Sequence, residues 1–249
     1  MKDINQKAIL DFLEENHYAQ ITEISQKLYV SPSTVRRTLN ELQAKGLVTR
    51  KHGGVQLNNE NNYFPSFTFR THQNSIEKKK MALLAINLIH DGDVIFLDGS
   101  TSTFFIAEYL KTFKNIVVIT NGIDTLSVLS KCGITAFSTG GMISPTNNSV
   151  LVGHNASESI KCFHANVSFL SAQSVDKYGT VYDCFNEENA IRSVMMENSS
   201  KKVILLDDSK LNKTSPYRLC SIKDFDVVIS NSDIGDKFEN ATIPRLIYK

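Results

Sequence analysis

The sequence predicts a two-domain α/β protein: a small N-terminal domain of three helices and a β-hairpin, and a larger domain built on a mostly parallel sheet. Before residue 45, apolar residues recur at helical spacing. From about residue 76, apolar runs of strand length alternate with helical segments. The polar run 58–62 separates the two patterns. We therefore expect a small domain over residues 1–57, a linker over 58–74 and a larger domain over 75–249.

Three helices are expected in the N-terminal domain. An apolar stripe predicts a helix over about residues 4–16, and a second, short helix is expected after Thr22, which is a suitable N-cap. A tight turn at Tyr29-Val30 then leads into a third helix. Three short helices with a turn before the third are the plan of a helix-turn-helix domain.

The third helix is the most informative segment of the chain. Ser31 is a good N-cap, and Pro32 suits the first helical position. Apolar residues at helical spacing can face a core, whereas Arg36 and Arg37 project elsewhere, where paired guanidinium groups can contact phosphate or guanine edges. We predict a recognition helix. An ordinary capped surface helix with two solvated arginines is the alternative that this segment leaves open.

A β-hairpin with a basic, glycine-rich tip is expected next. Gly46 stands where the C-terminal cap of the third helix belongs, and segments 47–50 and 55–57 flank a basic tip. Such a wing would lie along the DNA backbone. Residues 26–57 contain six Lys or Arg and one Glu, a net charge of +5 in a chain of net charge +1. The expected DNA contacts are Ser31, Ser33, Thr34, Arg36, Arg37, Arg50, Lys51 and His52.

Composition excludes several classes of protein. A hydrophobic content of 41% is ordinary for a globular protein, and no stretch approaches the roughly 20 apolar residues of a membrane span. The N-terminus lacks a basic-then-apolar signal segment, so a cytoplasmic location is expected. The four cysteines are dispersed with no CxxC pair, which predicts reduced thiols rather than metal ligands or disulfides. No cofactor is expected.

The larger domain is expected to have a Rossmann-like fold, because strands and helices alternate along it. The strand-length apolar runs are 94–97, 116–119, 167–170, 203–206 and 227–229, with a further strand at 135–139. The helical segments are near 77–90, 101–111, 123–131, 155–163 and 187–199. Ligands of such sheets bind at the carboxyl ends of the strands, so the residues that follow the apolar runs are the candidates for a site.

Asp98-Gly99-Ser100-Thr101-Ser102 follows the first of these strands. Glycine and small hydroxyl residues at a strand-to-helix turn supply backbone N–H groups and hydroxyl donors, which suits a phosphate. A Ser/Thr-rich helix cap without a ligand is the alternative. No Gly-Lys-Ser/Thr or GxGxxG pattern is present there, which argues against a nucleotide or dinucleotide site. Asn121 and Lys210 follow two other strands, and Lys210 can neutralise a phosphate.

Both halves of the chain resemble the DeoR family of bacterial transcriptional regulators. In the N-terminal half the resemblance rests on Val-Ser-Pro-Ser-Thr-Val-Arg-Arg at 30–37 and Arg-Lys-His-Gly-Gly at 50–54. Thr38 stands where the family usually has an Asp after the paired arginines. In the larger half the landmarks include Glu77-Lys78, residues 97–102, Gly140-Gly141 and residues 207–210. The resemblance implies a winged helix-turn-helix domain and a sugar-phosphate-binding domain related to ribose-5-phosphate isomerase.

The function that this resemblance implies is a DNA-binding repressor of sugar-metabolism genes, controlled by a phosphorylated sugar and without enzymatic activity. Its partners would be double-stranded operator DNA and the effector, bound by a homodimer or homotetramer. The backbone and hydroxyl groups of the 99–102 loop, with Lys210, would hold the phosphate. The expected effector contacts are Asp98, Gly99, Ser100, Thr101, Ser102, Asn121, Glu188, Arg192 and Lys210.

The alternative is an isomerase-like enzyme that acts on a sugar phosphate and carries a fused DNA-binding domain. Enolisation needs a general base, for which Asp176, Glu187 and Glu188 are the available carboxylates. The acid cluster and glycine-rich lysine loop of the isomerase have no clear counterpart in residues 171–192. Arg192 also replaces the lysine that the regulator family has within the following helix, a departure that bears on which sugar is accepted.

Overall fold

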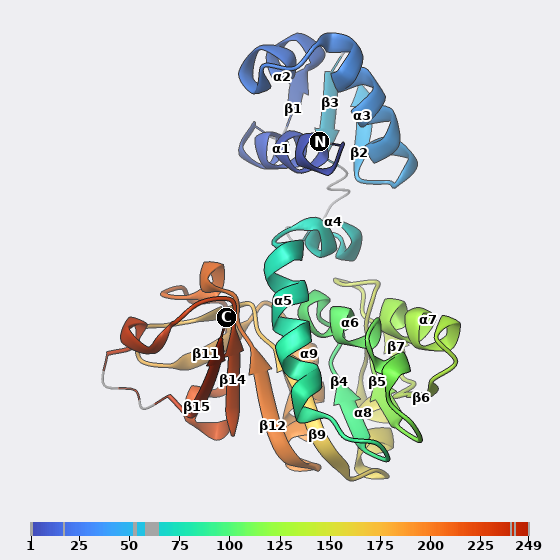
Figure 1. Ribbon diagram of the computed structural model, residues 1–249, viewed down its shortest axis with the longest axis vertical. Helices are drawn as coiled ribbons and strands as arrows, with labels where there is room; N and C mark the ends of the chain where they lie inside the picture. The colour runs from blue at the N-terminus through green and yellow to red at the C-terminus, as the bar shows by residue number, and fades with distance from the viewer. Residues whose placement is uncertain are drawn as a thin grey trace. The chain divides into compact units, whose positions relative to one another are not determined.

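The computed structural model divides into two units, residues 1–74 and 75–249, which we describe one at a time (Figure 1). It describes residues 2–16, 18–51, 54–57, 65–239, 241 and 243–248. Among these described residues, none of the helices has both the length and the apolar character that a bilayer crossing requires.

The N-terminal unit is a winged helix-turn-helix domain, as the sequence predicts. Its elements are α1 (Lys2–Asn16), β1 (Tyr18–Gln20), α2 (Ile21–Leu28), α3 (Pro32–Ala44), β2 (Val48–Lys51), β3 (Gly54–Leu57) and α4 (Phe67–His72). Strands β2 and β3 form the wing, and β1, which was not expected, joins them in an antiparallel sheet of order β1-β3-β2. A three-residue strand carries too little alternation to be recognised along the chain.

The ends of α2 and α3 show which capping predictions were right. Thr22 is not the N-cap of α2, because the helix already begins at Ile21 and the backbone N–H of Gln20 donates to Glu23 Oε2 at 2.7 Å. Ser31 does cap α3, since its Oγ accepts the backbone N–H of Thr34 at 3.2 Å. After the last turn of α3, Gly46 adopts a φ of 70°, a left-handed conformation that favours glycine.

A single apolar core holds these helices and the wing together. Its fully buried members come from α1, α2, α3 and both wing strands: Ile9, Leu13, Ile24, Val35, Leu39, Leu42, Val48 and Val55. Each such side chain contributes about 1.5–3 kcal/mol by leaving water. The core therefore sets the orientation of α3, whose apolar positions face inward.

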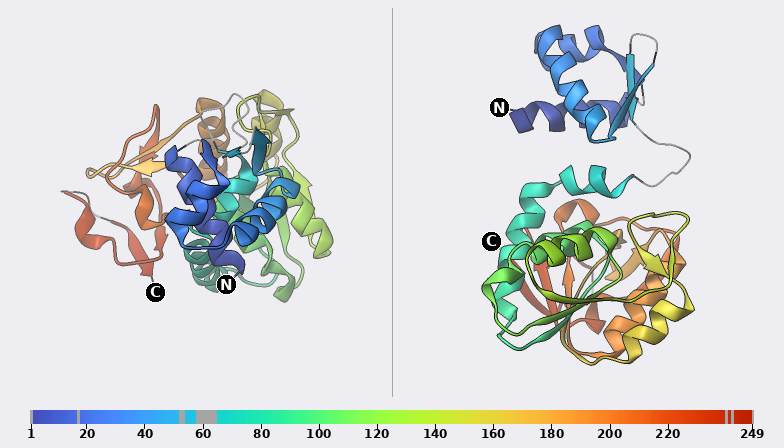
Figure 2. Two further views of the ribbon diagram at one scale, coloured as in Figure 1. Left: turned by 90° about the horizontal axis from the view of Figure 1, so that it is seen from above. Right: turned by 90° about the vertical axis from the view of Figure 1, so that its right-hand side faces the viewer.

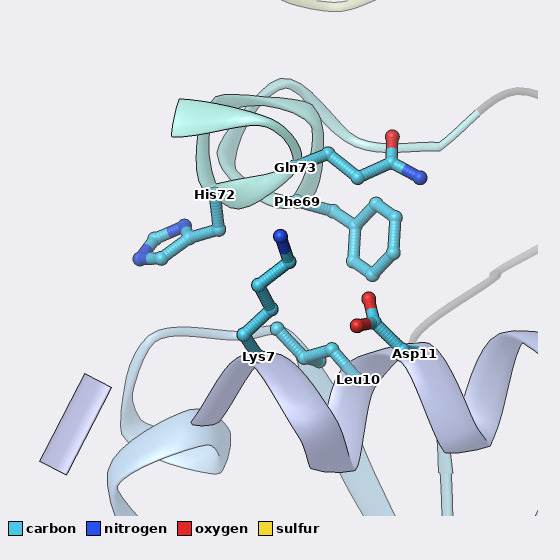
Figure 3. A pocket seen from close by; sticks show the side chains of 6 residues that line it. All are labelled: Lys7, Leu10, Asp11, Phe69, His72 and Gln73. Carbon is cyan, nitrogen blue, oxygen red and sulfur yellow. The ribbon is translucent and has the colours of Figure 1, made fainter. Parts of the chain in front are cut away.

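The predicted linker is partly helical. Ser66 Oγ accepts the backbone N–H of Phe69 at 3.2 Å and caps α4, and the Phe69 side chain packs into the core of the N-terminal domain. Figure 3 shows the pocket that this leaves between α1 and α4, lined by Lys7, Leu10, Asp11, Phe69, His72 and Gln73. Within the stretch predicted as a linker, residues 67–72 thus form a capped helix with buried aromatic side chains. Residues 58–64 lie outside the described part.

The larger unit contains a seven-stranded sheet in which every strand pair is parallel. Its order is β15-β14-β12-β9-β4-β5-β6. The strands are β4 (Val94–Leu97), β5 (Val117–Thr120), β6 (Thr135–Ser138), β9 (Ala165–Ser171), β12 (Ser199–Leu205), β14 (Val227–Ser230) and β15 (Arg245–Tyr248). Leu97 pairs with both Thr120 and Phe169, so the residues that follow β4, β5 and β9 come out at the same edge.

Helices cover both faces of this sheet. The α-helices are α5 (Ser75–Ala85), α6 (Thr101–Ala107), α7 (Ile123–Lys131), α8 (His154–Lys161) and α9 (Asn186–Glu197). Ile95 and Leu97 of β4 lie in the core that α5 and α6 cover, whereas Phe96 between them lies in the core under α8 and α9. In the right-hand view of Figure 2, α5 (teal) lies on one side of the sheet and α8 and α9 (yellow and orange) lie on the other, while α6 and α7 share the face of α5. This alternation explains why the strands read as continuous apolar runs.

Short elements complete the larger unit. The antiparallel strands are β7 (Met142–Ile143), β8 (Leu151–Val152), β10 (Ser174–Val175), β11 (Thr180–Asp183) and β13 (Tyr217–Ser221). The 3₁₀ turns are η1 (Ile86–Leu88), η2 (Leu110–Thr112), η3 (Asp208–Lys210), η4 (Ile222–Asp224) and η5 (Gly235–Lys237). None of these strands, nor β15, was expected, but the mostly parallel α/β architecture was.

Candidate functional site

Three hydroxyl groups cluster at the start of α3. The Oγ of Ser31 lies 2.9 Å from both Ser33 Oγ and Thr34 Oγ1. Ser31 and Ser33 are exposed and Thr34 is half-buried. These groups follow directly from the local sequence, because the cap of Ser31 turns the first residues of the helix toward its own side chain. They present hydrogen-bonding groups at the helix end that enters the groove in helix-turn-helix proteins.

Exposed arginines extend this surface onto the wing. Arg36 and Arg37 are exposed, whereas Val35 and Leu39 of the same helix are buried. Arg50 of β2 donates through Nη2 to the backbone carbonyl of Arg36 at 3.1 Å, which ties the wing to the recognition helix. The basic side chains of α3 and β2 therefore lie on one surface, at the positions that the sequence predicts.

Two predicted backbone contacts cannot be placed from the structure. Lys51 is the last residue of β2, and its side chain lies outside the description. His52 lies outside the described residues altogether. Thr38, which stands at the position where the family usually has an Asp, is 6% exposed and lies on the inner side of α3. Its side chain is therefore directed away from the surface of Arg36 and Arg37.

Asp98 lies at the carboxyl edge of the parallel sheet, where four groups of the protein lie within hydrogen-bond distance of its carboxylate. Its Oδ1 accepts the backbone N–H of Ser100 at 3.1 Å and the hydroxyl of Thr103 at 2.8 Å. Its Oδ2 accepts the backbone N–H of Ser171 at 3.0 Å and Nε of Arg192 at 2.9 Å. A carboxylate has about four such positions, so Asp98 shapes the loop and keeps at most one of them for a sugar hydroxyl.

The protonation of Asp98 follows from these contacts. Burial raises the pKa of its carboxyl, but the charge of Arg192 and the hydrogen bonds from Ser100, Arg192 and Ser171 outweigh burial. The pKa of Asp98 is therefore lower than usual, and the group is ionised at neutral pH.

Arg192 is a buried cation surrounded by three carboxylates. Its Nε lies 2.9 Å from Asp98 Oδ2, its Nη1 3.1 Å from Asp183 Oδ2 and its Nη2 3.2 Å from Glu188 Oε2. Glu188 Oε1 in turn accepts Nδ2 of Asn147 at 2.8 Å. Burial lowers the pKa of Arg192, but the three carboxylates outweigh it and raise the pKa above its usual value. The guanidinium thus links the loop after β4 with β11 and α9, and Glu188 connects it to the segment after β7.

Lys210 meets the hydroxyl-rich loop through a serine that was not among the predicted site residues. Lys210 Nζ donates to Ser171 Oγ at 2.7 Å and lies 4.0 Å from Asp207 Oδ2. Ser171 Oγ also lies 3.4 Å from Ser102 Oγ. Burial lowers the pKa of Lys210, which the carboxylates of Asp207 and Asp98 partly offset. Ser171 ends a long apolar strand, so the strand-end rule could have found it.

Asp207, which sequence reasoning also left out of the site, is a second buried carboxylate at this edge. Burial raises its pKa, but the charge of Lys210, the hydrogen bonds from Ser209 and the charge of Lys78 outweigh burial, so that the pKa is lower than usual. Lys78 is itself 5% exposed, so α5 also brings a buried cation to this carboxylate. The charges of two lysines from distant parts of the chain thus both stabilise the ionised form of Asp207.

The rest of the predicted phosphate loop is tightly packed. Ser100 Oγ accepts the backbone N–H of Thr103 at 3.3 Å and caps α6, and Thr101 and Ser102 are buried. Gly99 is required by space, because a Cβ there would lie 2.3 Å from Val150 Cγ1. Ser100 therefore acts as a helix cap, which is one of the two interpretations of this loop. The tight packing around Gly99 leaves no room for a side chain at that position.

Asn121 brings an unpartnered oxygen to the same edge. Its Nδ2 donates to the carbonyl of Leu151 at 3.1 Å, but its Oδ1 is buried without a hydrogen-bond partner among the described residues. Thr125 Oγ1 is in the same situation. A Cβ on Gly99 would lie 3.5 Å from Asn121 Oδ1, and one on Gly122 would lie 2.9 Å from Thr125 Oγ1. Two unsatisfied polar atoms thus flank the loop, and buried groups of this kind call for a partner.

The three carboxylates considered as a general base serve other roles. Asp176 accepts the backbone N–H groups of Tyr178 and Thr180, each at 2.9 Å, and shapes a turn. Glu187 is exposed, and Glu188 is held by Arg192 and Asn147. None of these three contact patterns is typical of a general acid or base.

Comparison with known families agrees with both halves of this structure. Residues 6–61 match the family described as the DeoR-like helix-turn-helix domain, and residues 73–232 match the DeoR C terminal sensor domain. The chain belongs to the DeoR family of transcriptional regulators. Within this DeoR-family protein, the first match contains the cluster around α3, and the second contains the strand-end network.

Relatives of the DeoR-family chain match it along nearly its whole length. The L-fucose operon activator of Haemophilus influenzae is 30% identical over 93% of this chain and 92% of that protein. The HTH-type transcriptional repressor GlcR of Bacillus subtilis is 31% identical over 90% of this chain and 86% of its own. Among solved structures, ribose 5-phosphate isomerase from Plasmodium falciparum aligns with 55% of this chain and 52% of its own, with a TM-score of 0.40 and 19% identity.

Proposed function

We propose that this regulator binds operator DNA through α3 and the wing, and that a phosphorylated sugar bound at the carboxyl edge of the parallel sheet controls that binding. The observation that carries the proposal is the contact of Lys210 with Ser171, which brings an ammonium group next to Ser102 and the loop after β4. Relatives named for sugar operons support the class of effector.

The DNA contacts proposed are the residues that the sequence predicts. Arg36 and Arg37 are exposed on α3, and no salt bridge to a carboxylate holds either of them among the described residues. They are proposed to contact base edges together with Ser33 and Thr34, while Arg50 and the wing tip contact phosphates. Lys45 is a weaker candidate, because its Nζ donates to Gln6 Oε1 at 2.8 Å.

Lys210, rather than Arg192, is the proposed cation for the phosphate. Arg192 is already neutralised by three carboxylates, and an incoming phosphate would have to displace one of them. Lys210 is bound by a neutral hydroxyl and lies 4.0 Å from its nearest carboxylate, longer than a close charge-assisted hydrogen bond. The backbone of Gly99 to Ser102 would complete the phosphate site.

The sugar hydroxyls are proposed to meet the unpartnered oxygens at this edge. Asn121 Oδ1 and Thr125 Oγ1 are buried acceptors that a hydroxyl donor would satisfy. Asp98, Glu188 and Arg192, which the sequence led us to expect as sugar contacts, take a supporting role in this proposal because their charges already pair with one another. We also propose that the chain is not an enzyme, since relatives that align along most of it are named as an operon activator and a transcriptional repressor.

A homodimer is the proposed functional form. One helix-turn-helix domain with a net charge of +5 over residues 26–57 offers few phosphate contacts. Two half-sites about one helical turn apart, read by two copies, are the usual way to gain specificity. The relatives include an activator and a repressor, so a test of function must detect either direction of control.

The proposal is tested by calorimetry followed by DNA titration. Pairs of pentoses and hexoses with and without phosphate are titrated into the full chain, and the best ligand is then added during titration of operator DNA selected from a random-sequence pool. We expect the phosphates to bind and the plain sugars to bind far more weakly, because the donors and Lys210 would be left unpaired. Equal binding of plain and phosphorylated sugars would contradict the proposed site.

A matched pair of lysine variants sharpens this experiment. Lys210→Met is expected to weaken effector binding at least about tenfold and to leave DNA binding without its response. Lys213→Met is the control, because Lys213 is exposed and donates only to the carbonyl of Ser209 at 2.7 Å. A Lys210→Met protein that responds to the effector like the parent would show that the phosphate lies elsewhere.

A further inference from the structure

The two outer strands of the seven-stranded sheet differ in how their free edges are protected. Strand β15 begins with Arg245 directly after Pro244, and proline and charge are the usual means of preventing an edge from pairing with another strand. Strand β6 lies at the opposite end of the sheet and, among the described residues, pairs only with β5 (Figure 1). No Asp, Glu, Lys or Arg occurs over residues 132–157. The β6 edge therefore lacks the charge that would keep another strand away.

Apolar side chains lie exposed beside this edge. Phe137 of β6 is 47% exposed, and Met142 and Ile143 of β7 are 57% and 56% exposed. The ring of Phe137 lies 5.3 Å from that of Phe163, which is half-buried. We call Phe137, Met142, Ile143 and Phe163 the β6 patch. A group of exposed apolar residues next to an unpaired, uncharged strand edge marks an interaction surface.

We infer that the β6 patch is the surface through which two copies of this chain associate, with their β6 strands antiparallel across a two-fold axis. The inference rests on the proposed homodimer and names its interface. A two-fold axis brings the residues nearest to it close to their own counterparts, so a charge at those positions would repel its copy. The absence of charge over residues 132–157 meets this condition for β6 and β7, and the nearby charges of Glu158 and Lys161 pair with each other at 2.7 Å.

The unpaired backbone groups of β6 also favour a second copy of this chain as the binding partner. An edge strand presents N–H and C=O groups that a second strand can satisfy, and an identical strand in antiparallel orientation does so symmetrically. Phe137 would then lose its exposure against the other copy, together with Met142 and Ile143. The association would join the two sheets into one continuous sheet across the axis.

Sedimentation velocity of the full chain over a concentration series, without DNA or effector, tests the inference. Phe137→Lys places like charges across the axis and is expected to weaken self-association at least about tenfold. Leu83→Lys is the control, since Leu83 on α5 is also 47% exposed. Because Phe137 packs on Phe163, Met142→Lys serves as a second variant, and thermal unfolding checks that each variant is folded.

Hydrogen exchange adds a readout that side-chain contact alone would not change. Backbone amides of residues 135–138 are expected to exchange more slowly as the parent protein is concentrated, and to lose this protection in Phe137→Lys. A dimer that both patch variants leave intact, or that Leu83→Lys disrupts instead, would overturn the inference while leaving the proposed homodimer in place. A strict monomer at every concentration would overturn both.

Discussion

The proposed DNA-contacting surface and the network at the sheet edge both contain arginine, but they use its charge in opposite ways. Arg36 and Arg37 are exposed on α3, whereas Arg192 is about 4% exposed and lies within 3.2 Å of three carboxylates. A guanidinium that is exposed to water needs no carboxylate partner, because water solvates its charge. It is therefore available to bind a phosphate or a guanine. A buried guanidinium must be paired within the protein, because desolvation of an isolated charge costs several kcal/mol.

The comparison shows that the environment of an arginine, rather than the residue type, decides whether its charge is available to bind a ligand or is used to stabilise the fold. Lys210 stands between the two cases, since it is largely buried but is bound mainly by a neutral hydroxyl. This intermediate position is the reason that Lys210 is the proposed cation for the phosphate. Changes at the two arginine sites should therefore affect different measurable properties.

Loss of the buried cation is expected to have the largest effect. Arg192→Met leaves Asp98, Asp183 and Glu188 close together without a neutralising charge, and breaking such a buried network costs about 3–5 kcal/mol. Urea denaturation followed by circular dichroism measures this loss in the larger unit. Arg37→Met is the control and should change stability by less than about 0.5 kcal/mol. Equal free energies of unfolding for the two variants would contradict the view that Arg192 stabilises the fold and Arg37 does not.

Acid should destabilise the larger unit through Asp98 and Asp207, whose pKa values are both lowered in the fold. Their contribution is fully present above the unfolded pKa of about 3.9. It is lost as the pH falls below that value and through the lower folded pKa values, because the unfolded chain binds protons first. Urea midpoints at pH 7, 5, 4 and 3 measure this. In Asp207→Asn the drop below pH 4 should be smaller, and an unchanged drop would exclude Asp207 as a cause.

Substitution of the exposed arginines should affect binding and spare the fold. Arg36→Ala or Arg37→Ala is expected to weaken operator binding by about 1–3 kcal/mol if the side chain contacts a guanine, and to relax sequence specificity at that base pair. Fluorescence anisotropy with the selected operator and with single-base variants measures both effects. The urea midpoint of each variant should match that of the parent. Unchanged affinity in both variants would remove these residues from the interface.

The smallest effect expected concerns the cap of α3. Ser31→Ala removes the acceptor for the backbone N–H of Thr34 and should cost about 1 kcal/mol of domain stability. Ser31→Asp keeps an acceptor at this position, so stability should be retained, but its negative charge would repel DNA. Denaturation and DNA titration of the two variants separate capping from contact. A Ser31→Asp protein with full operator affinity would place Ser31 away from the phosphates.

Several helices, strands and helix caps of this protein could be predicted from local sequence. The helix predicted at 123–131 and the strand predicted at 94–97 have the bounds that the structure gives them, and Ser31 and Gly46 mark the ends of α3 as expected. These features depend on caps, turns and apolar periodicity, which act within a few residues. The strand-end rule also placed Asp98, Asn121 and Lys210 at one edge, because parallel strands align their carboxyl ends.

Tertiary structure alone decided which of these groups are available. Arg192 and Asp98 are 94 positions apart in the chain, and Asn147 and Glu188 are 41 apart, so no local pattern could show that they neutralise or hold one another. Short strands such as β1 and β11, and the helix α4, likewise depend on partners that are distant in sequence. The sequence by itself determined the winged helix-turn-helix architecture, the mostly parallel α/β domain and the edge of the sheet at which Asp98, Asn121 and Lys210 lie. Only the folded chain decided that Arg192 is already paired while Lys210 is not tightly paired, because burial and pairing depend on every element that packs around a charge.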